Sequence, residues 1–146
     1  MYVTTSKRLT YEGARKMIAA AIDQARAAKI AISCCVVDAG GHVIALDRMD
    51  GGPFHTLHSC STKAVCASST KRKTSAKGAV GQTLDVAHAL GLTLAAGPER
   101  WTAMEGGVPI MVDGECVGGI GVSGGDWETD QRIAQMAVES IGAKGG

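Results

Sequence analysis

Apolar residues recur at every third or fourth position over residues 11–28. Thr10 precedes this segment and has the side chain of a helix N-cap, and Glu12 places a negative charge in the first turn. The spacing predicts an amphipathic helix over residues 11–28. Its buried face would consist of Ala14, Met17, Ile18, Ala21, Ile22, Ala25 and Ala28.

Two apolar, β-branched segments follow this helix. The first, IAISCCVVD (30–38), has almost no polar position, as expected for a strand that is buried on both faces. The second, HVIALDR (42–48), comes directly after the short turn Ala-Gly-Gly at 39–41. Two strands joined by so short a loop predict an antiparallel hairpin.

Small and polar residues dominate the middle of the chain. From Thr56 onward one helical face could be formed by Leu57, Cys60, Ala64 and Ala67, so we predict a helix there. Residues 74–107 have a weaker pattern. They indicate a short helix near 82–90, an apolar segment LTLAA (92–96) and a turn at GPERW (97–101).

A second hairpin is predicted where VPIMV (108–112) and ECVGGIGVS (115–123) flank Asp113-Gly114, a strong type I′ turn signal. A last helix follows Asp126 as its N-cap, with a stripe formed by Asp130, Ile133, Ala134, Ala137 and Ile141. Hairpins without crossovers predict an α+β fold, an antiparallel sheet with helices packed on it. The length suits a single domain over residues 1–146.

The stretch GGIGVSGGDW (118–127) contains the glycine spacing of a dinucleotide-binding turn. That turn needs a second parallel strand after its helix, and here the predicted helix runs to the end of the chain, so this interpretation fails. In a strand, Gly119 and Gly121 share one face and leave bare backbone. Either a helix packs on this strip or a ligand approaches it.

Composition narrows the classes of partner. The net charge is +1, and two Trp, two Tyr and one Phe are too few for a base-stacking platform, so we predict no nucleic-acid partner. No apolar run reaches the roughly 18 residues of a membrane span, and no signal-peptide core is present, so no membrane partner is predicted. Five cysteines without a C-x-x-C motif are typical of reduced thiols in a cytoplasmic protein.

The predicted helix after Thr56 carries the main candidates for chemistry. Thr56, Cys60 and Lys63 share one face, where a partly buried lysine would suit a base or an anion-binding group, although a surface lysine is the alternative. His55 and His58 lie one turn apart and could ligate haem, share a metal or exchange protons. Because no third ligand is evident, we predict no metal site.

Further candidates lie near the second hairpin. Glu105 could act as a base beside the amides of Gly106 and Gly107, and the turn at Gly124, Gly125 and Asp126 leads into a helix whose N-terminus could hold an anion. Trp127 is either a core anchor or a wall of the pocket. Arg48 could bind a substrate carboxylate, but an ion pair with Asp47 or Asp50 is favoured.

Several of these motifs together resemble the GlcG/HbpS-like family, which is named for haem degradation and also supplies the C-terminal domain of PduO-type corrinoid adenosyltransferases. The resemblance rests on VVDAGGHVIALDRMDG (36–51), Lys63-Ala64, GGVPIMVDGECVGGIGVSGG (106–125) and Asp130-Gln131. It implies a profilin-like, three-layer α/β/α fold around an antiparallel sheet of about five strands, and a homo-oligomer. Where the family usually has D-G-A-P-x-G-S, this chain has DGGPFHT (50–56).

Three functions follow from these observations. We expect a cytoplasmic protein that binds a small anionic metabolite, as an accessory catabolic enzyme of isomerisation, hydration or hydrolysis. Lys63, His58 or Glu105 would move the proton, and no cofactor is predicted. The alternative, implied by the resemblance, is a haem- or corrinoid-binding or haem-degrading protein. A structural or regulatory oligomer is the third.

Overall fold

The centre of the structure, a computed structural model that describes residues 1–146, is one antiparallel sheet of four strands in the order β2-β1-β4-β3. The strands are β1 (Ser33–Asp38), β2 (Val43–Arg48), β3 (Gly107–Val112) and β4 (Glu115–Ser123). Both predicted hairpins are confirmed, since β1 pairs with β2 and β3 pairs with β4. Antiparallel pairing of β1 with β4 joins the two hairpins into a single sheet.

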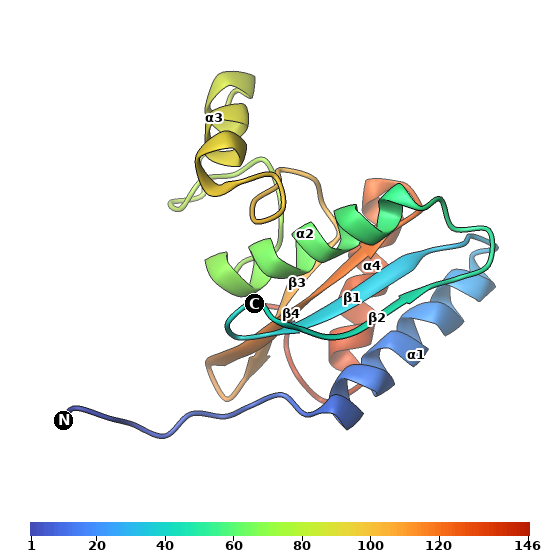
Figure 1. Cartoon of the computed structure of the whole chain (residues 1–146), viewed down its shortest axis with the longest axis horizontal. Helices are drawn as coiled ribbons and strands as arrows, with labels where there is room; N and C mark the ends of the chain where they lie inside the picture. Colours follow the sequence, from blue (N-terminus) through green and yellow to red (C-terminus); the bar gives the residue numbers. More distant parts are fainter.

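Helices cover both faces of this sheet, as Figure 1 shows. The chain has four helices, α1 (Tyr11–Ala27), α2 (His55–Thr70), α3 (Val86–Ala96) and α4 (Trp127–Glu139), and all but α3 lie on the sheet. α1 and α4 pack side by side on one face and α2 packs on the other, which confirms the α/β/α layering. The predicted caps of α1 and α4 are present, because Thr10 accepts a hydrogen bond from the amide of Gly13 and Asp126 accepts one from Thr129.

The number of strands is four, one fewer than the family resemblance implies. Lys144 lies beside the free edge of β3, and its backbone exchanges two hydrogen bonds with Met111, at 2.8 and 2.9 Å. This contact is an isolated bridge. The fifth position of the sheet therefore holds a single pairing and no strand.

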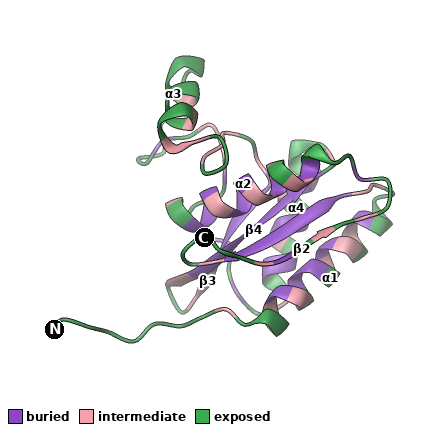
Figure 2. Ribbon diagram, viewed as in Figure 1, coloured by how far each residue is buried: buried purple, intermediate pink, exposed green.

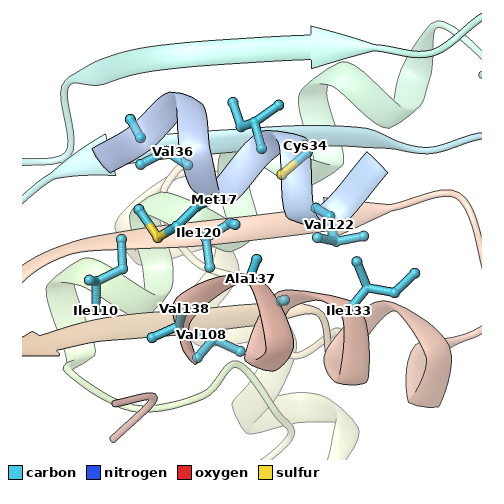
Figure 3. Packing of buried hydrophobic residues seen from close by; sticks show 14 of the residues in the cluster. Met17, Cys34, Val36, Val108, Ile110, Ile120, Val122, Ile133, Ala137 and Val138 are labelled. Carbon is cyan, nitrogen blue, oxygen red and sulfur yellow. The ribbon is translucent and has the colours of Figure 1, made fainter. Parts of the chain in front are cut away.

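Most of the buried hydrophobic residues lie in the layer between the sheet and the pair α1 and α4 (Figure 2). Figure 3 shows Met17 of α1 beside Val36 and Ile120 of the strands, and Ile133 of α4 beside Val122. A smaller cluster under α2 contains Cys35, Val37, Cys60 and Ala64. The adjacent residues Cys34 and Cys35 therefore point to opposite faces of β1, as alternation along a strand requires.

The bare glycine strip on β4 is covered by α2. A Cβ atom added to Gly121 would collide with the carbonyl oxygen of Cys60, and one added to Gly119 would collide with that of Ala64. Both carbonyls belong to the backbone of α2, so neither can move aside. Of the two interpretations of this strip, helix packing is therefore correct.

The prediction for residues 82–96 needs correction. A single helix, α3, replaces the short helix near 82–90 and the separate apolar segment, because the Asp85 side chain accepts a hydrogen bond from the amide of His88 and starts the helix there. α3 stands away from the sheet and the other helices (Figure 1). None of the four helices combines the length and apolar character needed to cross a membrane.

Candidate functional site

A cleft of about 600 Å³ opens between α2, the start of α4 and the segment that follows α3. It lies beyond the end of β4, where the loop from Ser123 to Asp126 leads into α4. Residues from four separate parts of the chain meet there: the outward side of α2, Thr93 of α3, the segment 98–105 and the β4–α4 loop. A second cleft has a similar volume, but this one brings together titratable side chains from several elements, which makes it the candidate functional site.

The closed end of the cleft holds a buried ion pair. The ammonium of Lys63 lies 3.4 Å from Oδ2 of Asp130 and donates a 2.9 Å hydrogen bond to the carbonyl oxygen of Val122. Only 6% of the Lys63 side chain and 4% of the Asp130 side chain is exposed. Lys63 is thus a buried residue of the cleft, not the surface lysine that was the alternative.

Asp130 also determines the shape of the β4–α4 loop, because its Oδ1 accepts a 2.8 Å hydrogen bond from the amide of Gly125. Burial raises the pKa of the Asp130 carboxyl, while the Lys63 ammonium and the Gly125 amide lower it, with a net rise. A carboxylate so placed can hold a positive charge in position or accept a proton.

Two imidazoles and two indoles surround the mouth of the cleft. His55 and His58 project from the first turn of α2 and are exposed, Trp127 begins α4, and Trp101 comes from the segment after α3. Met104 and Glu105 complete this side. Ser59 and Ser123 are hydrogen-bonded to each other at 2.6 Å and close the wall between α2 and β4.

Seven of the residues predicted from sequence line the cleft together: Lys63, His58, Glu105, His55, Gly125, Asp126 and Trp127. Asp126 has a second task there, because its side chain caps α4 through the amide of Thr129 at 2.9 Å. That bond occupies part of the helix terminus that was expected to hold an anion. The predicted residues therefore converge on one cavity although they come from three regions of the chain.

Gly106 and Gly107, at the start of β3, lie behind the lining of the cleft. The Gly106 amide donates to Oε1 of Gln131 at 2.9 Å, and the Gly107 amide donates to the Thr74 hydroxyl at 2.8 Å. A Cβ atom on Gly106 would lie 2.9 Å from the Lys63 ammonium, so glycine leaves room for that side chain. Their amides are used within the protein, which is not the ligand-facing arrangement that the sequence suggested.

Four other candidates lie outside the cleft lining. Thr56 is buried and shares a 2.7 Å hydrogen bond with Ser33. Cys60 lies on the side of α2 that packs on the sheet, and Gly124 lies against the backbone of Ala31. Arg48 donates to the carbonyl oxygen of Gly52 at 2.8 Å. The expected ion pair of Arg48 is wrong, because Arg15 takes Asp47 in a pairing at 2.9 Å.

Asp130 is the main residue that sequence reasoning missed as a site residue. It was placed in the stripe of the last helix and in the Asp130-Gln131 motif of the family resemblance, without a role in the site. A lone acidic residue among Ile133, Ala134 and Ala137 was a further signal, since a buried charge needs a partner. Trp101 and Met104 had no such signal, because they lie in a segment without regular pattern. No group of three or more His, Cys, Asp or Glu side chains is placed to hold a metal ion.

Comparison with known proteins places these features in context. Residues 9–139 match the family described as "haem degrading protein HbpS-like". Protein GlcG of Escherichia coli K12 is 34% identical over 117 residues, which is 79% of this chain and 81% of that protein.

Solved structures agree with this match. The Klebsiella pneumoniae protein ORFY has a TM-score of 0.85 at 30% identity, with 97% of both chains covered. The crystal structure described as a PduOC:haem complex has a TM-score of 0.84 at 26% identity, and the match covers 95% of this chain and 99% of that one. One of these structural relatives was therefore crystallised with haem.

Proposed function

Because this chain belongs to the family of HbpS-like haem-degrading proteins, we propose that the cleft between α2 and α4 binds haem. The observation that carries the proposal is the pair His55 and His58 at the mouth of a cleft that also presents two tryptophans. Neutral imidazole is a common axial ligand of haem iron. The PduOC relative, similar over nearly the whole chain, is a haem complex.

The lining suits a flat, mostly apolar molecule with acidic substituents. Trp101, Trp127 and Met104 offer surfaces that can lie against a ring, and Met104 and Trp127 are largely exposed in the chain alone. A volume of about 600 Å³ lies within the usual range of ligand sites. Bound haem would supply redox and ligand-exchange chemistry at its iron, and the choice of axial ligand sets that chemistry.

The residues of the chain have separate tasks in this proposal. His55 or His58 binds the iron, and the tryptophans exclude water from the ring. Lys63 has three N–H donors and uses two of them on Val122 and Asp130. The third supports an acidic group of the ligand at the closed end of the cleft, where burial strengthens a charged hydrogen bond.

Titration of the purified protein with haemin tests the proposal. We expect a saturable shift of the Soret band with one haemin per chain, weakened by about 10- to 100-fold or more when the ligating histidine is replaced, because even outer-shell partners of metal ligands contribute that much. His55→Ala, His58→Ala and the double variant are compared with His42→Ala and His88→Ala, whose exposed histidines lie outside the cleft. An equal shift in the double variant would rule out histidine ligation here.

A second candidate function is acid/base catalysis on a small anionic metabolite. The buried pair of Lys63 and Asp130 favours it, because burial of a charge pair in a cleft is common at catalytic sites. His58 and Glu105 line the same cleft and could exchange protons with the metabolite. Turnover of a small carboxylated substrate that survives His55→Ala but is lost in a folded double variant Lys63→Met/Asp130→Asn, which removes both members of the buried pair, would favour this function over haem binding.

We also propose that the protein is a cytoplasmic homo-oligomer. All five cysteines are free and four are buried, as is usual where thiols stay reduced. The family resemblance supports assembly. Light scattering at micromolar concentration tests it, and a single species of 14.9 kDa would contradict it.

A further inference from the structure

α3 exposes apolar side chains that nothing in the chain covers. Leu90 is 55% exposed, Leu94 is 71% exposed, and no residue of the helix is buried. Figure 2 shows the helix almost entirely as exposed and set apart from the sheet. With eleven residues, α3 is also shorter than the roughly 12–15 residues at which isolated helices become stable in water. A partner that covers α3 would remove both difficulties.

On the face of α3 that points away from the molecule, a row of small residues lies beside a row of large ones. Ala89, Thr93 and Ala96 are half-buried and mark the side toward the body. On the opposite side Ala87, Gly91 and Ala95 form a row four residues apart, a groove of small residues, beside the ridge of Leu90 and Leu94. Nothing lies within 4 Å of the place where a Cβ of Gly91 would be.

We propose that this face of α3 pairs with α3 of a second copy of the chain, with the two helices crossing at Gly91. The inference rests on the proposed homo-oligomer and assigns its interface. Around a two-fold axis through Gly91, the leucine ridge of each helix lies over the small-residue groove of the other, the packing in which i±4 rows interdigitate. Ridge and groove occur on the same helix, so the face is complementary to itself.

Charge supports a second copy as the partner. α3 contains no Asp, Glu, Lys or Arg, and His88 is its only titratable residue, so pairing two copies brings no like charges together at neutral pH. A partner that recognised this helix by charge would find no counter-charge on it. The pairing would also hold Thr93 and the segment 98–105 in place, and these form one wall of the cleft.

Light scattering on two variants of the full chain tests the interface. Gly91→Leu fills the groove, and because the site is open and leucine favours helix, the isolated chain should fold as before. Leu94→Glu puts a charge on the ridge. We expect each variant to lower the mass of the wild-type species by half or more, while the circular dichroism spectrum loses at most the contribution of the unpaired α3.

Tyr11→Glu is the matched control, since Tyr11 is 67% exposed on α1 and should leave the mass unchanged. Wild-type mass in both α3 variants would place the interface elsewhere and leave the homo-oligomer intact. A loss of association in Leu94→Glu alone would overturn the crossing at Gly91. A wild-type chain of 14.9 kDa would overturn both proposals, whereas the haemin titration tests the cleft independently.

Discussion

Lys63 and Asp130 neutralise each other at the closed end of the cleft, and each keeps the other from being a lone buried charge. We predict that Lys63→Met destabilises the fold by about 3–5 kcal/mol at neutral pH, because removal of one partner leaves the other charge buried and unpaired. Urea unfolding of the variant and the wild type gives this difference. The double variant Lys63→Met/Asp130→Asn should recover much of it, since neither member of the buried pair is then left as an unpaired charge.

The same pair makes the effect depend on pH. Burial raises the pKa of Asp130 in the folded chain, and loss of the opposing ammonium raises it further. A carboxyl whose pKa is higher in the folded than in the unfolded state contributes stability below its unfolded pKa, and this contribution is lost as the pH rises through the folded pKa. Lys63→Met should therefore lower the free energy of unfolding less at about pH 4 than at about pH 7. Equal destabilisation at both would contradict the assignment.

The cysteines differ in access and in pKa. Burial raises the pKa of Cys35 to about 11 and that of Cys60 to about 12, and it also raises those of Cys34 and Cys66. A thiol reacts as its thiolate, so these four should be slow toward a thiol-specific dye. We predict one fast thiol per native chain, Cys116, which is only half-buried. Cys116→Ser should abolish the fast phase, and a second fast thiol would contradict the prediction.

Many residues of the candidate site could be proposed from the sequence, but which of them pair with each other could not. Lys63, the histidine pair and Trp127 could be proposed from helical spacing and from the motifs around them. The pairing of Lys63 with Asp130 spans 67 positions and depends on how α2 and α4 lie across the sheet, which no local pattern contains. Arg48 was misassigned for the same reason, because Arg15 reaches Asp47 from α1.

Among the elements, the contact of α2 with β4 depends most on single residues. Gly121→Ala should destabilise the fold by about 3 kcal/mol or more, beyond ordinary overpacking, because the added methyl group would meet the α2 backbone at Cys60. Gly91→Ala is the matched control: its surroundings are open, and alanine favours helix, so stability should hold or rise. Thermal unfolding measures both. Equal melting temperatures would mean that α2 does not press on β4.

Element types were predictable where one face is buried and the other is not. α1 and α4 have both a cap and a buried stripe, and their observed bounds lie within about three residues of those expected. α3 lacks a polar side, so its apolar residues had no period that could separate a helix from an apolar segment. The four strands are those of the two predicted hairpins, and the family resemblance implied about one more, at the place where Lys144 makes a single backbone pairing.

At the scale of the whole molecule, the chain divides into a layered body and an excursion between Thr74 and Gly107. None of the hydrophobic residues between 75 and 105 is buried, and the excursion is closed at its base, where the Thr74 amide donates to the Gly107 carbonyl at 3.0 Å. The segment that follows α3 contacts α2 through the Thr62 hydroxyl, which donates a hydrogen bond to the carbonyl oxygen of Pro98. The body thus supplies the ion pair and the histidines of the cleft, and the excursion supplies the opposite wall and α3.

This division predicts that the body folds without the excursion. In the test variant, a Gly-Ser loop of about four residues, a common length for a connection within a domain, replaces residues 75–104. Both hydrophobic clusters keep all their members, because none of these lies between 75 and 104. We expect cooperative thermal unfolding and a circular dichroism spectrum that lacks only the contribution of α3. Haemin binding should be lost although His55 and His58 remain, because Trp101 and Met104 are gone, and self-association should be lost with α3. Non-cooperative unfolding of the shortened chain would mean that the excursion belongs to the folding unit and is not an addition to it.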